Sequence, residues 1–181
     1  MTPIIFEESG FRVEAPVPAF RLADLPPYRL LSGKRLKEMD VGWWGPSQEG
    51  QQRLTLLELK GLEVWQTTPD NPATPREHLV RTCVEKATDT LLMLAGAWTP
   101  TSWGTELSRS LPTQALPYPG DKALKLVFLI DIPVGQRELL LPVRDEINGR
   151  LQGRLGIFGM RRVSVVDFEA AQKMGLPVTR L

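Results

Sequence analysis

The chain has 181 residues, a formal net charge of +1 at pH 7, 42% hydrophobic residues and 24% charged residues. This balance is typical of one globular domain and gives no strong electrostatic signal for nucleic acid. The single cysteine, Cys83, and the single histidine, His78, exclude an internal disulfide framework and a zinc site built from several Cys and His ligands.

The remaining residue patterns exclude several other classes. There is no Gly-x-Ser-x-Gly elbow, no Gly-x-x-x-x-Gly-Lys-[Ser/Thr] phosphate loop and no Gly-x-Gly-x-x-Gly fingerprint. The first ten residues lack a charged segment followed by an apolar core, so we expect no signal peptide. No apolar run is long enough to cross a membrane. Together with the lack of disulfides, this predicts a cytoplasmic protein with no membrane association.

Residues 1–27 contain five prolines, which argue against a long helix. We expect an irregular N-terminal arm here, with one short strand at residues 11–14, where apolar and polar residues alternate. Residues 28–181 are expected to form a single α/β domain. Its first residues, 28–31, are predicted to be extended and to end in a turn at Ser32-Gly33.

A β-hairpin is predicted next. Residues 34–44 alternate between apolar and polar side chains, residues 45–52 are polar and rich in breakers, and residues 54–60 form a mostly apolar strand. Pairing Trp44 with position 53 or 54 places Asp40 opposite position 57 or 58. Asp40 and Glu58 are therefore expected to be neighbours across two strands, and their carboxylates should face one cleft.

The later chain alternates between helices and strands. Thr74 is a helix N-cap followed by Pro75, and an apolar stripe with Lys86 and Thr90 at its edge continues to Trp98. Further elements are expected as a central strand at 124–132, a helix at 142–155, a strand at 162–166 and a short helix at 168–174. This order predicts an α/β sandwich with a mixed sheet.

Residues 99–123 are rich in Pro, Ser, Thr and Gly and show no period. We therefore expect a long loop, and connections of this length often serve a function. Its aromatic and basic residues, among them Trp103, Arg109 and Lys122, predict a loop beside the cleft that contacts nucleic acid.

The predicted elements follow one another in a characteristic order: an aspartate, a hairpin loop, a Glu-x-Lys triplet on the next strand, then a helix and a strand. This order resembles that of the PD-(D/E)xK nuclease superfamily. The matching residues are Asp40 in Glu38-Met39-Asp40-Val41 and the triplet Glu58-Leu59-Lys60. The similarity covers residues 35–132 by element order. It implies the restriction-endonuclease-like fold, a mixed central sheet flanked by helices.

The resemblance implies a metal-dependent nuclease, a hydrolase that cleaves phosphodiester bonds in nucleic acid, most simply DNA. It makes Asp40, Glu58 and Lys60 catalytic and assigns a metal to Asp40, Glu58 and the Leu59 carbonyl. The metal would be Mg²⁺ or Mn²⁺, because hard cations prefer carboxylate and carbonyl oxygens. Lys60 would act on the attacking water and on the charged transition state.

Further assignments follow from the same resemblance. Many relatives supply one more glutamate from a helix before the hairpin. The candidates in this chain are Glu7, Glu8 and Glu14, in a region where no clear helix is expected. Basic residues near the predicted cleft would bind nucleic acid, namely Lys34, Arg35, Lys37, Arg109 and Lys122. A homodimer is left open by the sequence.

Two alternatives remain at this point. The chain could be a catalytically inactive module of the nuclease fold that binds nucleic acid or a protein partner. It could also be a small α/β interaction protein in which Glu58 and Lys60 are only a structural ion pair. Convergence of Asp40, Glu58 and Lys60 in an open cleft would favour the nuclease or the inactive nuclease-fold module, whereas a Lys60 packed away from Asp40 would favour the interaction protein.

Overall fold

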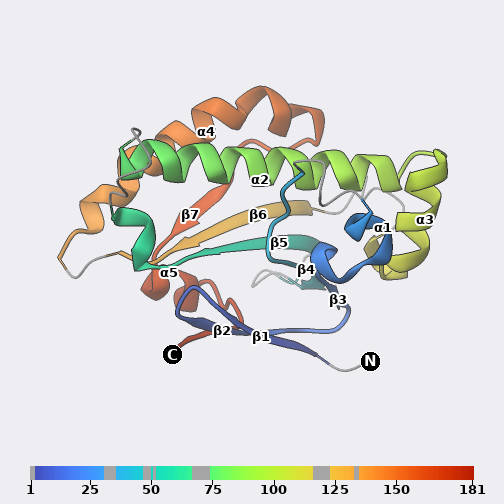
Figure 1. Ribbon diagram of the computed structural model, residues 1–181. Coiled ribbons are helices and arrows are strands. Elements are labelled where there is room, and N and C mark those ends of the chain that lie inside the picture. Colours follow the sequence, from blue (N-terminus) through green and yellow to red (C-terminus); the bar gives the residue numbers. More distant parts are fainter. Residues whose placement is uncertain are drawn as a thin grey trace.

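The computed structural model describes residues 3–30, 36–46, 50, 52–66, 74–115, 123–132 and 135–181. At its centre is a five-stranded mixed sheet with long helices on one face (Figure 1). A three-stranded antiparallel sheet packs against the other face. The expected α/β class with a mixed sheet is therefore confirmed.

The large sheet combines antiparallel and parallel pairs. Its first two neighbouring pairs are antiparallel and its last two are parallel. In spatial order the strands are β3 (Ala19–Phe20), β4 (Val41–Pro46), β5 (Gln52–Lys60), β6 (Ala123–Ile130) and β7 (Ser164–Val166).

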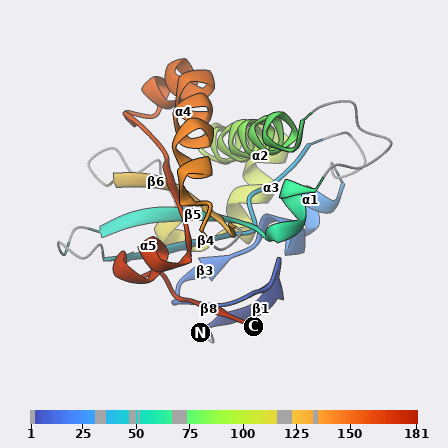
Figure 2. The same ribbon diagram turned by 90° about the vertical axis from the view of Figure 1, so that its left-hand side faces the viewer.

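The two longest helices cover one face of this sheet, and the short C-terminal helix lies on the other face (Figure 2). The covering helices are the ones that the capping residues and apolar spacing predicted. The α-helices are α1 (Pro26–Arg29), α2 (Pro75–Ala97), α3 (Ser102–Ser110), α4 (Leu140–Ile157) and α5 (Phe168–Lys173). In the described segments, 3-10 turns accompany them at Leu22–Asp24, Leu62–Trp65, Thr113–Ala115 and Arg137–Leu139.

Strand β5 is buried on both faces, which explains its almost continuous apolar sequence. Leu54 and Leu56 belong to the core beneath α2 and α4. Leu57 and Leu59 belong to a second core, between the large sheet and the three-stranded sheet. Because successive side chains alternate between faces, Glu58 lies on the same face as Leu54 and Leu56 and points toward the helices.

The N-terminal region forms more strands than expected. The predicted strand at 11–14 is present as β2 (Phe11–Ala15), but it lies between β1 (Ile4–Glu8) and β8 (Val178–Arg180). Most of the segment expected to be irregular is therefore ordered. The prolines did exclude a long helix, and β2 is stabilised instead by pairing with the far end of the chain.

Two local expectations before the hairpin were wrong. The segment expected to be extended from residue 28 begins inside α1, a short helix that accommodates Pro26 and Pro27 in its first turn. The strand expected at 34–44 begins only at Val41. Residues 36–40 lie outside β4, and two of their backbone N–H groups bind side chains of α2 instead of a neighbouring strand.

The segment 99–123 is not a continuous loop. Thr101 caps α3 by accepting a hydrogen bond from the Gly104 N–H at 3.0 Å. Trp103 lies against Gly96 of α2, and its indole N–H donates to the Pro27 carbonyl at 3.1 Å. The helix was missed because it is short and its stability comes from packing on α1 and α2.

The contact between α3 and α2 generates a prediction. A methyl group at Gly104 would collide with the Gly96 carbonyl and lie 2.8 Å from the Thr99 carbonyl oxygen. Gly104→Ala should therefore destabilise the protein by about 1–3 kcal/mol, as overpacking does. The control Gly153→Ala, in α4 with open space around it, should stabilise by about 0.5–1 kcal/mol. Urea denaturation measures both, and equal effects of the two variants would contradict this packing.

Candidate functional site

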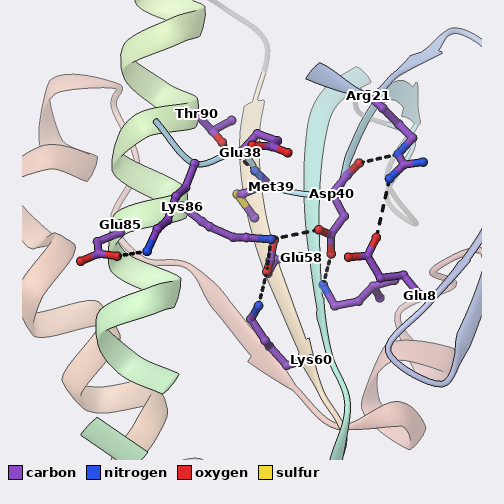
Figure 3. Close-up of polar contacts among 12 residues, drawn as sticks. Glu8, Arg21, Glu38, Met39, Asp40, Glu58, Lys60, Glu85, Lys86 and Thr90 are labelled. Carbon is purple, nitrogen blue, oxygen red and sulfur yellow. Dashed lines mark hydrogen bonds and ion pairs between the residues drawn. The ribbon is translucent and has the colours of Figure 1, made fainter. Parts of the chain in front are cut away.

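The hairpin register brings the predicted acidic residues together. Trp44 pairs with Leu54 and Val41 pairs with Leu57, so Asp40, one residue before β4, is placed opposite Glu58. Of the two registers left open by the sequence, this is the one that makes the carboxylates direct neighbours. Both carboxylates lie on the helix face of the sheet, beneath α2 (Figure 3).

Glu58 is the buried centre of this group. Its exposed fraction is 0%. The Lys60 ammonium lies 2.7 Å from Glu58 Oε1, and a second ammonium, from Lys86, lies 2.7 Å from the same oxygen. The other oxygen, Oε2, is buried without a hydrogen-bond partner in the part of the chain that the structure describes. A buried carboxylate oxygen without a partner is costly, and a water, an ion or a catalytic role can each account for one.

Lys86 joins the two carboxylates. It extends from the middle of α2, and its Nζ lies 3.1 Å from Asp40 Oδ1 as well as 2.7 Å from Glu58 Oε1 (Figure 3). Sequence analysis placed Lys86 at the edge of the apolar stripe but gave it no role. Its spacing along α2 could not show which strand residues would lie beneath it.

The position of Asp40 is fixed by hydrogen bonds of its side chain and of the residues before it. Its Oδ2 accepts a hydrogen bond of 2.6 Å from the Leu59 N–H. The preceding segment is held by α2, because Thr90 accepts from the Met39 N–H at 2.8 Å and Asp89 accepts from the Lys37 N–H at 2.9 Å. These contacts orient the Asp40 carboxylate toward β5 before any ligand arrives.

Two residues from the N-terminal region, Glu8 of β1 and Arg21, lie on the other side of the site. Arg21 donates to the Asp40 carbonyl at 3.2 Å and lies 3.6 Å from Glu8 (Figure 3). The turn after Glu8 lies against the residue that follows Lys60, since a methyl group at Gly61 would be 2.9 Å from the Ser9 carbonyl oxygen. Of the three candidate extra glutamates, Glu8 is therefore the one beside the site.

The other two candidate glutamates are engaged elsewhere. Glu7 lies 3.9 Å from Arg12, and Glu14 lies 3.1 Å from the same guanidinium. Both glutamates are exposed on the three-stranded sheet. Strand alternation separates Glu7 from its neighbour Glu8, which faces inward.

Burial and mutual charge shift the pKa values of this group. Burial, and next the Asp40 carboxylate, raise the pKa of Glu58 to about 7 although Lys60 and Lys86 lower it. The same two causes, in the same order, raise the pKa of Glu8. Burial alone lowers the pKa of Lys86, but Glu58 and then Asp40 outweigh it, so that pKa is raised and Lys86 is charged at neutral pH.

The donor set fits a hard divalent cation. Asp40 and Glu58 provide carboxylate oxygens, and Glu58 Oε2 has no hydrogen-bond partner among the described residues. The Leu59 N–H donates to the Asp40 carboxylate, and in a strand the carbonyl of the same residue points to the same side, so the Leu59 carbonyl also points toward Asp40. Among the described residues no cluster of three or more His, Cys, Asp or Glu side chains forms a metal-ligand group. Two carboxylates with waters completing the shell are nevertheless a common arrangement for Mg²⁺.

The predicted nucleic-acid contacts are only partly placed. Lys34, Arg35 and Lys122 lie outside the described residues. Lys37 is half-exposed and lies 2.6 Å from Glu85 of α2. Arg109 is exposed on α3, which packs near Gly96, about 15 Å along the α2 axis from Lys86. The described structure therefore does not bring Arg109 to the carboxylates.

No protein-family model, curated protein or solved structure matches the chain. In the described part of the chain, no helix is long and apolar enough to cross a membrane.

The raised pKa of Glu58 predicts how stability depends on pH. The folded protein keeps a proton on Glu58 up to about pH 7, whereas the unfolded chain releases it near its ordinary value of 4.5. Between about pH 4.5 and pH 7 the folded protein therefore binds more protons than the unfolded chain, so a rise in pH destabilises the fold. Over this range, the free energy of unfolding of wild type should fall by on the order of a few kcal/mol relative to that of Glu58→Gln.

Urea denaturation of wild type and Glu58→Gln at pH 5, 6, 7 and 8 measures this difference. The exposed Glu106→Gln variant controls for the loss of one carboxylate. Parallel pH profiles for wild type and Glu58→Gln would show that Glu58 does not titrate in this range.

Proposed function

We propose that this chain is a metal-dependent nuclease of the PD-(D/E)xK type that hydrolyses phosphodiester bonds, with DNA as its substrate. The observation that carries the proposal is the convergence of Asp40, Glu58 and Lys60 on one face of the β4–β5 hairpin. Lys60 contacts Glu58, as a structural ion pair would as well, so the support comes from Asp40, which the strand register places opposite Glu58.

The topology around the hairpin supports the same proposal. β5 is antiparallel to β4 and parallel to β6, and α2 is the crossover that connects β5 to β6 over the helix face. The acidic residues therefore lie at the end of a central strand beneath the crossover helix. This is the element order from which the restriction-endonuclease-like fold was expected, and that fold is part of the proposal.

Each residue of the site has a distinct role in the proposal. Asp40 and Glu58 would hold Mg²⁺ or Mn²⁺ together with the Leu59 carbonyl. When bound, the cation would neutralise charge that develops on the phosphate and lower the pKa of a water. Lys60, whose ammonium lies within hydrogen-bonding distance of Glu58, would orient the attacking water and donate to the phosphate oxygens.

A second function is favoured by a specific observation. The Lys86 ammonium already contacts both carboxylates and the Lys60 ammonium contacts Glu58, so the two negative charges are balanced within the chain. A protein that uses this arrangement only for stability would be an inactive nuclease-fold module that binds nucleic acid or a protein partner. Metal binding and cleavage distinguish this module from the enzyme.

Divalent cations should stabilise the folded protein if Asp40 and Glu58 bind them. A ligand that binds only the folded state raises its stability by mass action, so the melting temperature should rise by several degrees with millimolar Mg²⁺ or Mn²⁺. Asp40→Asn should lose most of this rise, whereas Asp145→Asn, an exposed carboxylate on α4, should keep it. The same small shift in all three proteins would argue for non-specific ion effects.

Lys60→Ala should separate catalysis from binding. Cleavage of supercoiled plasmid and single-stranded oligonucleotides with Mg²⁺ or Mn²⁺ should fall about a hundredfold or more, while DNA binding changes little. Asp40→Ala and Glu58→Ala should lose metal binding and cleavage together. Lys173→Ala, which removes an exposed lysine of α5, should cut at the wild-type rate.

This assay also decides between the two functions. A wild-type protein that binds DNA but does not cut it with either metal would support the inactive module. A folded Lys60→Ala protein that cuts as fast as wild type would remove Lys60 from the mechanism.

A further inference from the structure

We propose that Lys86 is a built-in cation that competes with divalent metal for Asp40 and Glu58, so that metal binds only when the Lys86 ammonium leaves. This inference rests on the proposed metal site and adds its regulation. No sequence pattern suggested it, because Lys86 lies on a helix that is distant in the chain from both acidic residues.

The geometry of Lys86 differs from that of Lys60. Lys60 contacts Glu58, whereas Lys86 contacts both carboxylates, at 2.7 Å from Glu58 Oε1 and 3.1 Å from Asp40 Oδ1 (Figure 3). Lys86 thus joins oxygens from two strands, which is the role proposed for the metal ion. An ammonium has three donors and no lone pair, so it cannot itself become a metal ligand.

A metal and the Lys86 ammonium cannot share this position. Mg²⁺ binds oxygen at about 2.0–2.1 Å, so an ion held by Asp40 Oδ1 and Glu58 Oε1, the two oxygens that Nζ contacts, would occupy the space of Nζ. Charge gives the same answer. With Glu58 ionised, two carboxylates and two ammoniums sum to zero, and adding a divalent ion to that buried group would leave it at +2. Departure of Lys86 lowers this sum to +1.

The chain offers the displaced ammonium another partner. The Lys86 side chain keeps 18% of its surface exposed and hangs on four flexible carbons. Asp89 lies three residues further along α2, on the same side of the helix, at a spacing that supports ion pairs. Lys86 can therefore leave the carboxylates without unfolding α2.

The competition has a measurable consequence for Mn²⁺ affinity. Titration calorimetry of wild type and Lys86→Met should show Mn²⁺ binding about tenfold or more tighter in the variant, the scale on which one adjacent charge shifts an equilibrium at a carboxylate. Lys37→Met is the matched control. It removes the same charge from a lysine that pairs with Glu85 of the same helix, and it should leave Mn²⁺ affinity unchanged.

Stability provides a second readout that does not depend on activity. Lys86→Met and Lys86→Gln should melt below wild type without metal, since Glu58 loses one of its two cations. Mn²⁺ should then raise their melting temperatures more than it raises that of wild type, because the ion replaces the missing ammonium. Variants that Mn²⁺ fails to stabilise beyond the wild-type shift would overturn the inference.

The outcomes separate this inference from the proposed function. If wild type binds Mn²⁺ and cuts DNA but Lys86→Met binds Mn²⁺ no tighter, the competition is refuted and the nuclease proposal stands. If Lys86→Met gains affinity while Lys37→Met does not, Lys86 is the competing cation. If neither wild type nor the Lys86 variants bind Mn²⁺, both the metal site and the competition are refuted.

Discussion

The buried carboxylate of Glu58 sets the constraint that the surrounding structure must meet. It lies in a strand whose neighbours on the same face, Leu54 and Leu56, are core residues. A charge in such a place is tolerated only when other charges or ligands compensate it. The chain supplies compensation from two directions, with Lys60 from the same strand and Lys86 from the helix above.

The position of α2 follows from the same constraint. The helix covers the core with its apolar stripe, but its polar edge also holds the approach to β4 through Asp89 and Thr90. One helix therefore buries Glu58, orients the segment that carries Asp40 and delivers the bridging Lys86. A substitution of Asp89 or Thr90 would therefore shift the segment that carries Asp40, although neither residue contacts the carboxylates.

Sequence patterns predicted the parts of this arrangement that depend on local signals. The register of the β4–β5 hairpin, the capped start of α2 and the apolar spacing of α4 all follow from residues close together in the chain. The N-terminal sheet could not be predicted in this way, because β2 pairs with β8 from the other end of the chain. The role of Lys86 could not be predicted for the same reason, because the way α2 crosses the sheet determines which residues lie beneath it.

The charge compensation also makes the proposed site for an anionic substrate compatible with a near-neutral chain. With Glu58 ionised, Asp40, Glu58, Lys60 and Lys86 balance one another, so these four side chains add no net charge to the resting protein. Under the proposed competition, a divalent ion that enters as Lys86 leaves would make this group positive and so favour the binding of a phosphate. Attraction for nucleic acid would then depend on metal, because field strength at a buried site is set by local charge more than by the total.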